Sequence, residues 1–311
     1  MIISVGDIML DIYIDEPGSL NADTDTIGRT NLAWGGSAAN FAVWARRLGM
    51  PSAIVGRLGR DFVGDAAVQD FISEGVLPLV ARDPSYPTGT VTVRRRGSLS
   101  RDMICDRKAN ARFSAEDLPM KEISAASWIH ISGYTVIEEG PRKAVVECIR
   151  AAKANGIPVS VDPGSCYLIG SLGVSHFMEA VDGADVILPN LDEARLLSSE
   201  EEMGKILDGL LGSFPTVVIK LGPEGALFAT RRGGSGHVRP PRIEAVDPNG
   251  AGDAFGAAFV CKYLATGDIA SATKAGCDLG SLVAGSSGAR AAIGLGRFLK
   301  DHFPGSGGAA V

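Results

Sequence analysis

Short β-branched runs of apolar residues alternate with amphipathic stretches along most of this chain. Six runs are predicted to be buried strands, at residues 2–5, 53–55, 128–131, 159–161, 186–188 and 217–219. Five stretches carry apolar residues at helical spacing, at residues 38–48, 65–73, 142–154, 193–198 and 203–211. Strands that are apolar on both faces and separated by helices form parallel sheets covered on both sides. The sequence therefore predicts an α/β fold, with a doubly wound, mostly parallel sheet flanked by helices.

Two segments, residues 12–34 and 88–108, break this alternation. Within the second, residues 90–94 alternate apolar and polar side chains, Gly97 and Ser98 are typical of a turn, and residues 99–105 return as a second strand. We predict that the two segments form a small β-sheet lid beside a ligand crevice, where such insertions exclude water. An ordinary edge hairpin is the alternative. We expect residues 1–311 to form a single domain, with residues 304–311 as a flexible tail.

Composition excludes several classes of protein. The chain has 36 acidic and 30 basic residues and a net charge of −6, whereas nucleic-acid-binding domains are normally basic. The five cysteines are scattered, which predicts a reducing cytoplasm and no structural zinc. The N-terminus lacks the features of a signal peptide, and no apolar run approaches the roughly 18–20 residues of a membrane helix. We therefore expect a cytoplasmic protein with no nucleic-acid or membrane partner, in which local groups hold any anionic ligand.

The segment from residue 247 to 260 carries the most chemical information. Gly250 and Gly252 precede an apolar helical stretch, and Asp253 lies in its first turn. The free N–H groups and the dipole of a helix N-terminus bind phosphate well. A carboxylate beside a bound phosphoryl group could accept the proton of an attacking hydroxyl, so the segment indicates phosphoryl transfer. Alternatively, Asp253 simply complements the helix dipole.

Two segments resemble the signatures of one family. Residues 247–260 resemble the C-terminal signature of the ribokinase-like (PfkB) family of ATP-dependent carbohydrate kinases, after a strand-like run at 243–246. Residues 35–42, with Gly49 and Gly59 downstream, resemble its N-terminal signature. The resemblance implies a ribokinase-like fold with a small β-sheet lid. It also implies transfer of the γ-phosphoryl group of ATP, with Mg²⁺, to a hydroxyl of a small sugar or sugar acid.

The resemblance also implies roles for individual residues. The catalytic group comprises Asp253 as general base and the backbone of Gly250, Ala251 and Gly252 as anion hole. The acceptor would be bound by Asp11, Gly35, Gly36, Asn40 and Arg107. ATP would be bound by Asn190, Glu193, Lys220, Gly222, Gly225 and Cys277, with Glu193 orienting Mg²⁺ through water. A monovalent cation, K⁺, would be held by Asp247 and Asn249.

Several of these assignments have structural alternatives. Asn190 and Glu193 have the spacing of a helix capping box, and the lid arginines are also compatible with a solvated hairpin. The chain has Pro248-Asn249 where the family commonly has Thr-Thr or Thr-Val, which leaves the K⁺ site open. It lacks the lysine that follows the glycines in ribokinases, which disfavours ribose.

Two other functions remain open at this point. A nucleoside kinase (adenosine-like) of the same fold would need an apolar slot for the base. Aromatic residues make up only 6% of the chain, and Tyr13 and Trp34 are the candidates. A nucleotide-binding sensor without turnover is disfavoured by the presence of Asp253. An exposed edge of the lid sheet is able to pair two subunits, so a homodimer through the lid is a further expectation.

Overall fold

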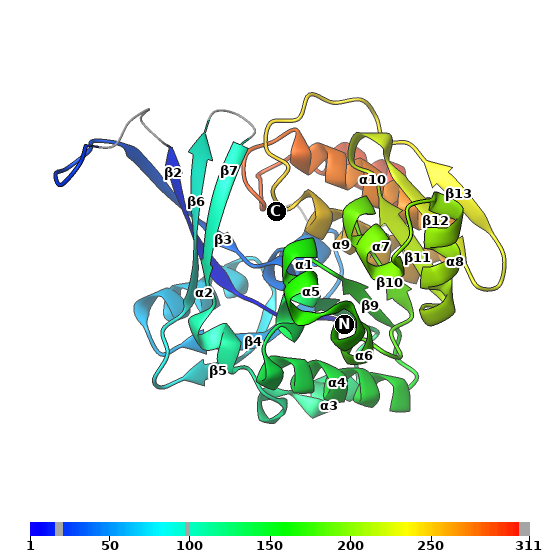
Figure 1. Ribbon diagram of the computed structural model, residues 1–311, viewed down its shortest axis with the longest axis horizontal. Coiled ribbons are helices and arrows are strands. Elements are labelled where there is room, and N and C mark those ends of the chain that lie inside the picture. The colour runs from blue at the N-terminus through cyan, green and yellow to red at the C-terminus, as the bar shows by residue number, and fades with distance from the viewer. Residues whose placement is uncertain (16–20, 97–99, 305–311) are drawn as a thin grey trace.

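Two β-sheets of different size organise the computed structural model, which describes residues 1–15, 21–96 and 100–304 (Figure 1). The larger sheet has nine strands, in the spatial order β13 (Ser235–Val238), β12 (Ala226–Thr230), β11 (Thr216–Lys220), β10 (Val186–Ile187), β9 (Val159–Asp162), β8 (Trp128–Ser132), β1 (Ile2–Val5), β4 (Ser52–Gly59) and β5 (Leu77–Asp83). The strands from β11 to β5 are parallel, whereas β12 and β13 join as an antiparallel edge. The predicted mostly parallel sheet is confirmed.

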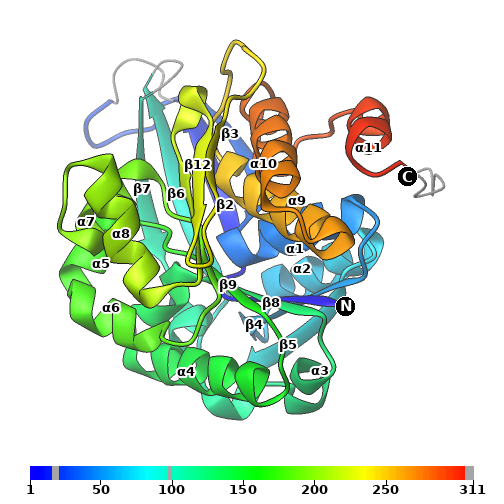
Figure 2. The same cartoon turned by 90° about the vertical axis from the view of Figure 1, so that its right-hand side faces the viewer.

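Helices cover both faces of this sheet (Figure 2). Their bounds are α1 (Ser37–Arg47), α2 (Phe62–Ser73), α3 (Met120–Ser124), α4 (Glu139–Ala154), α5 (Cys166–Leu172), α6 (Val174–Ala180), α7 (Leu191–Ser198), α8 (Met203–Ser213), α9 (Ala251–Thr266), α10 (Ile269–Ala284) and α11 (Gly296–His302). Short 3₁₀ turns are η1 (Lys108–Arg112), η2 (Ala115–Asp117), η3 (Gly133–Val136) and η4 (Gly222–Glu224). All five predicted helical stretches lie in or within one residue of observed helices.

Alternate side chains of the central strands divide the core into two halves. Ile2 of β1 belongs to a buried cluster that includes Trp44 of α1 and Phe259 of α9. Its neighbour Ile3 belongs to another cluster, which includes Ile149 of α4. Because successive side chains of a strand point to opposite faces, the helices of the first cluster lie on one face and α3–α8 on the other. This explains why the central strands carry apolar side chains on both faces.

The smaller sheet stands apart from the larger one, and is called the small sheet below (Figure 1). Its strands follow the order β3 (Arg29–Gly35), β2 (Met9–Asp15), β6 (Gly89–Arg96) and β7 (Ser100–Asp106). The predicted hairpin is present, because β6 and β7 pair antiparallel with Thr90 opposite Asp106. Three residues, 6–8, separate β1 from β2, so the small sheet begins close to where β1 of the large sheet ends. The predicted turn at residues 97–98 and the tail at 305–311 lie outside the described residues.

One expectation about the local structure was wrong. Residues 243–246 form no strand, and Ile243 and Val246 are 42% and 52% exposed. Instead the Val246 and Asp247 N–H groups both donate to the Ala284 carbonyl at the end of α10. Apolar residues flank Glu244 in this run, but it has no neighbouring strand to pair with. In the described part of the chain, no helix is both long and apolar enough to cross a membrane.

Candidate active site

The start of α9 has no side-chain cap. Gly250 precedes the helix with φ +76°, and a Cβ there would lie 2.5 Å from Cα of Ala289, so only glycine fits this turn. The N–H groups of Gly252 and Asp253 precede the first intrahelical bond, from Ala254 to Gly250. Such N–H groups bind an anion readily.

Two side chains of α1 orient the carboxylate of Asp253. Ser37 Oγ donates to its Oδ1 at 2.6 Å, and Asn40 Nδ2 donates to its Oδ2 at 2.8 Å. Both donors come from α1, so the two signature segments meet in space although 213 residues separate Asn40 from Asp253. Burial raises the pKa of Asp253 to about 6, although both donated hydrogen bonds act to lower it. The side chain is partly exposed, and its oxygens retain lone pairs for a ligand hydroxyl.

A lysine lies beside this helix start. A Cβ built on Gly252 would lie 3.3 Å from Lys220 Nζ, which places the ammonium next to the open N–H groups. Lys220 comes from the end of β11, and its Nζ donates to Asp162 Oδ2 at 2.5 Å. Burial disfavours its charge, but the charges of Asp162 and Glu193 outweigh burial and raise the pKa of Lys220. The cation is therefore retained where a phosphate would bind.

Asp11 and two glycines form the neighbouring part of the site. Asp11 is 7% exposed, and burial raises its pKa to about 6; the charge of Asp253 acts in the same direction. A Cβ on Gly35 would overlap the Asp11 carboxylate, and a Cβ on Gly36, at φ +92°, would overlap the Asp7 carbonyl oxygen. The two glycines therefore allow β3 and the start of α1 to pass close to both carboxyl-bearing residues. The structure thus places Gly35 and Gly36 beside Asp11 and Asp7, and contact of Asp11 and the two glycines with an acceptor stays a prediction.

Arg107 is used within the protein. It is 8% exposed, and its Nε and Nη2 donate to the two carboxylate oxygens of Asp7 at 2.8 and 2.7 Å. Nη1 forms an ion pair with Glu138. Nearby, Asn110 accepts from the Ile8 N–H and donates to the Ile8 carbonyl, which fixes the connection between β1 and β2. Contact between Arg107 and a substrate stays a prediction, because Asp7 already engages two of its nitrogens.

The turn before α9 contacts the small sheet. Asn249 Nδ2 donates to the Tyr13 hydroxyl at 2.6 Å, and that hydroxyl lies 3.5 Å from Asp11 Oδ2. Asp247 accepts from the N–H groups of Asn249 and Gly288. The nearby Ala289 carbonyl accepts from Trp44 Nε1. The Asn249 amide nitrogen thus points to β2, and the K⁺ site of Asp247 and Asn249 stays a prediction.

Asn190 and Glu193 form the capping box that their spacing allows. Asn190 Oδ1 accepts from the Glu193 N–H, while the Glu193 carboxylate accepts from the N–H and Nδ2 of Asn190. Burial, followed by the charge of Asp162, raises the pKa of Glu193 to about 7. The carboxylate is 2% exposed. A capping role is therefore observed, and a role through water toward Mg²⁺ remains compatible with it.

The remaining residues predicted to bind ATP lie near the antiparallel edge of the large sheet. Gly222 begins η4 and Gly225 follows it, with φ +58° and +94°, and a Cβ on Gly225 would overlap the Val238 carbonyl oxygen. Only glycine at position 225 thus allows β13 to lie this close to the turn after η4. Cys277 is 4% exposed in α10, with Sγ 3.7 Å from the same carbonyl, and burial raises its thiol pKa to about 12. Contact of either residue with ATP stays a prediction.

The donor set suits ATP with Mg²⁺. Among residues 1–15, 21–96 and 100–304, no group of three or more His, Cys, Asp or Glu side chains could hold a metal ion. Mg²⁺ does not need one, because it keeps several waters and is bound by one or two carboxylates together with substrate phosphates. Glu193 and Asp162 supply carboxylates on the same side as Lys220, and the cradle at Gly252 supplies the amides.

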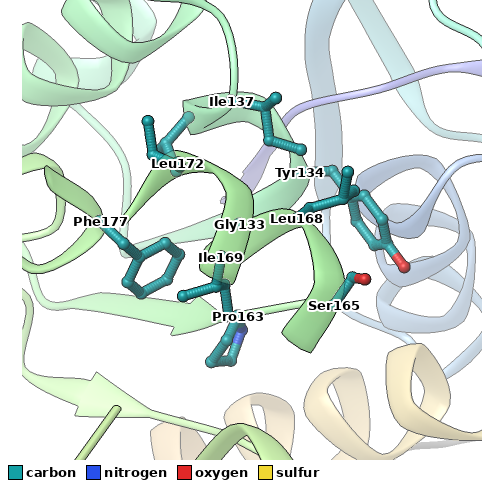
Figure 3. Close-up of a pocket in the computed structure, with 10 residues that line it drawn as sticks. Gly133, Tyr134, Ile137, Pro163, Ser165, Leu168, Ile169, Leu172 and Phe177 are labelled. Atoms are coloured by element: carbon teal, nitrogen blue, oxygen red, sulfur yellow. The ribbon is translucent and has the colours of Figure 1, made fainter. Parts of the chain in front are cut away.

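Sequence reasoning missed three contributors. Ser37 lies inside the first signature but is not among the predicted site residues, and Arg290 lies outside both signatures. Tyr134, in η3, donates its hydroxyl to the Gly164 carbonyl at 2.9 Å, and burial and the charge of Asp253 raise its pKa. Figure 3 shows Tyr134 at the edge of a narrow pocket, with its hydroxyl directed away from the apolar residues Phe177 and Leu172.

Comparison with known proteins settles the family. A family model described as pfkB family carbohydrate kinase matches residues 1–293. The chain belongs to this family. It is therefore an enzyme, a phosphotransferase with an alcohol group as acceptor, and the resemblance inferred from the two signatures is confirmed.

Individual relatives cover most of the chain. An ATP-dependent ribose-1-phosphate kinase of Halopiger xanaduensis is 30% identical over 298 residues, which are 94% of each chain. A 2-dehydro-3-deoxygluconokinase of Thermoproteus tenax is 30% identical over 269 residues, 83% of this chain and 81% of that one. Among solved structures, an E. coli protein assigned as ribokinase II, in complex with ATP and Mg²⁺, has a TM-score of 0.84 and 25% identity and covers 93% and 94% of the two chains.

Proposed function

We propose that this kinase transfers the γ-phosphoryl group of ATP to a hydroxyl of a small sugar or sugar acid, with Asp253 as general base. The observation that supports this most directly is the position of Asp253. Its carboxylate is oriented by two donors and adjoins an open helix start with Lys220 beside it. Phosphoryl transfer requires this combination of a proton acceptor and an anion cradle.

The chain's own residues divide the work as follows. Asp11 and Asn40 hydrogen-bond the acceptor, and one acceptor hydroxyl approaches the free lone pair of Asp253. Asp253 takes its proton as the hydroxyl oxygen bonds to phosphorus and the bond to the ADP oxygen breaks. The N–H groups of Gly252 and Asp253, together with Lys220, stabilise the charge on the transferred group. When bound, Mg²⁺ offsets the charge of the phosphate oxygens.

The class of acceptor is supported by the relatives and by the site. The two relatives described above carry the names of kinases for a sugar phosphate and for a sugar acid. The acceptor side of the site presents the polar groups of Asp11, Asn40 and Tyr13. A nucleoside would need an apolar slot as well. Tyr13, one of the two aromatic candidates, lies beside Asp11, so a nucleoside kinase of the same fold stays the alternative that the acceptor panel tests.

Three secondary roles complete the proposal. The small sheet acts as the lid of one catalytic unit, and it excludes water when substrates are bound. Its exposed edge pairs two subunits in a homodimer. Asp247 and Asn249 hold a K⁺ ion. Gel filtration tests the homodimer and the K⁺-dependence of the rate tests the cation site, each separately from catalysis.

An acceptor panel tests the function. Wild-type protein and Asp253→Asn would be assayed for ADP formation with ATP, Mg²⁺ and pentoses, hexoses, sugar acids, sugar phosphates and nucleosides. We expect turnover with a sugar or sugar acid, and a kcat for the variant lower by about 10²–10⁴-fold. Thermal shift with a non-hydrolysable ATP analogue is the control, because ligand binding raises apparent stability.

Two results would contradict the proposal. Turnover confined to nucleosides would replace the acceptor class. Near-normal turnover of Asp253→Asn, with the analogue still bound, would remove the assignment of the base.

A further inference from the structure

Arg290 lies under the acceptor site, in the segment between α10 and α11. Its side chain is 9% exposed. Nε donates to Asn40 Oδ1 at 2.9 Å, and Nη1 donates to Asp70 Oδ2 of α2 at 2.8 Å. The guanidinium also lies 5.5 Å from the centre of the Phe71 ring. One buried cation therefore joins α1, α2 and the segment that follows α10.

The contact with Asn40 determines how that side chain is turned. An arginine can only donate hydrogen bonds, and an ionised carboxylate can only accept them. Asn40 lies between the two, with Oδ1 toward Arg290 and Nδ2 toward Asp253 Oδ2 at 2.8 Å. If the amide turned over, its Nδ2 would face the guanidinium and its Oδ1 would face the carboxylate. Arg290 thus excludes the orientation in which Asn40 could not donate to Asp253.

We propose that Arg290 is a positioning residue for the transfer reaction, which locks the Asn40 amide so that it orients the general base. The inference rests on the proposed function and extends it to a residue outside both signatures. Among the residues that the structure describes, Asn40 and Ser37 are the two side chains that donate to the Asp253 carboxylate. Loss of the Arg290 contact would therefore affect the Asp253 carboxylate through one side chain, that of Asn40.

The charge of Arg290 adds a second link. It acts to lower the pKa of Asp11, which burial raises. The other charged groups that face Arg290 are Asp70 and Glu74 from α2 and Arg47 from α1. Removing the guanidinium should therefore make Asp11 harder to ionise, in addition to releasing Asn40.

The rival explanation is a purely structural one. Arg290 could matter only because it braces α2 through Asp70 and Phe71. Asp70→Ala removes this brace and leaves the contact with Asn40, so it is the matched control. Arg290→Met removes both contacts at similar length, and Arg290→Lys retains a donor of the same charge.

Steady-state kinetics on these variants test the proposal. We expect Arg290→Met to lower kcat at least tenfold, Arg290→Lys to recover part of that loss, and Asp70→Ala to stay within threefold of wild type. In an Asn40→Ala background, Arg290→Met should lower kcat by clearly less than in the wild type, because only its effect on Asp11 remains. Full additivity of the two substitutions, or equal losses in Asp70→Ala and Arg290→Met, would overturn the proposal.

A second readout does not depend on turnover. Carboxyl ¹³C NMR of Asp-labelled protein measures the titration of Asp253 directly. Arg290→Met and, if that variant is poorly folded, Arg290→Lys should raise the pKa of Asp253, because Asn40 no longer donates reliably to the ionised form. An unchanged titration would overturn the positioning role. An absence of kinase activity in the wild type with a changed titration would instead reject the proposed function and retain the lock.

Discussion

Replacing Ser37 by alanine should move the pH dependence of the reaction. The Ser37 hydroxyl donates to Asp253 Oδ1 at 2.6 Å, and this bond favours the ionised carboxylate. A hydrogen bond to a charged group contributes about 1.5–3 kcal/mol, and about 1.36 kcal/mol corresponds to one pH unit. Its loss should therefore raise the pKa of Asp253 from about 6 by about one to two pH units.

The effect on rate follows from the ionised fraction of the base. At pH 7 this fraction falls from about nine-tenths to between about one half and one tenth, so kcat should fall about two- to tenfold. Raising the pH to about 9 should restore most of the rate, because the base is then ionised again. A coupled assay of ADP formation from pH 5 to 9 measures the profile. Ser37→Thr keeps the hydroxyl and is the matched control, with a profile close to that of the wild type.

Two outcomes would refute this reasoning. A loss of kcat that is equal at every pH would mean that Ser37 places a group without affecting its ionisation. An acidic limb that does not move at all would mean that the group titrating in the profile is not Asp253.

Three further predictions concern stability and the small sheet. Gly36→Ala should lower the free energy of unfolding, measured by urea titration, by about 1–3 kcal/mol more than Gly49→Ala does. Both glycines have positive φ, but only an alanine at position 36 would overlap a neighbour, the Asp7 carbonyl. Equal losses would contradict this. Tyr13→Phe removes the hydroxyl that joins β2 to the turn before α9, so the acceptor KM should rise severalfold while the ATP KM stays constant; a rise in both would argue against a link specific to the acceptor. The folded-state pKa of Asp253, about 6, lies above its ordinary 3.8, so stability from this group is complete below pH 3.8 and is lost as pH rises through 6. The side chain at position 253 does not titrate in Asp253→Asn. The difference in melting temperature between this variant and the wild type should therefore shift in favour of the variant from pH 4 to pH 8, by the equivalent of at most about 3 kcal/mol. A difference that does not change with pH would contradict the shift.

Local pattern was enough to predict the main architecture. The runs at residues 2–5 and 159–161 have the apolar composition that is typical of strands buried on both faces. The structure has β1 and β9 at these positions. The run at 243–246 also begins and ends with a β-branched apolar residue, yet it has no partner strand. A strand is completed by hydrogen bonds to a neighbour, and the neighbour is a property of the whole fold.

The candidate site shows the same division between sequence and tertiary structure. The sequence by itself predicted which residues can do chemistry: the glycines that open the start of α9, the carboxylate of Asp253, and the carboxylate of Asp11, which lies in β2. It could not determine which side chains hold them. Ser37 and Arg290 are ordinary residues in the sequence, and they act on Asp253 only because α1 and the segment after α10 fold against α9. Hydrogen bonds act over about 3 Å, so the partners of a functional group are decided where distant segments meet in the folded chain.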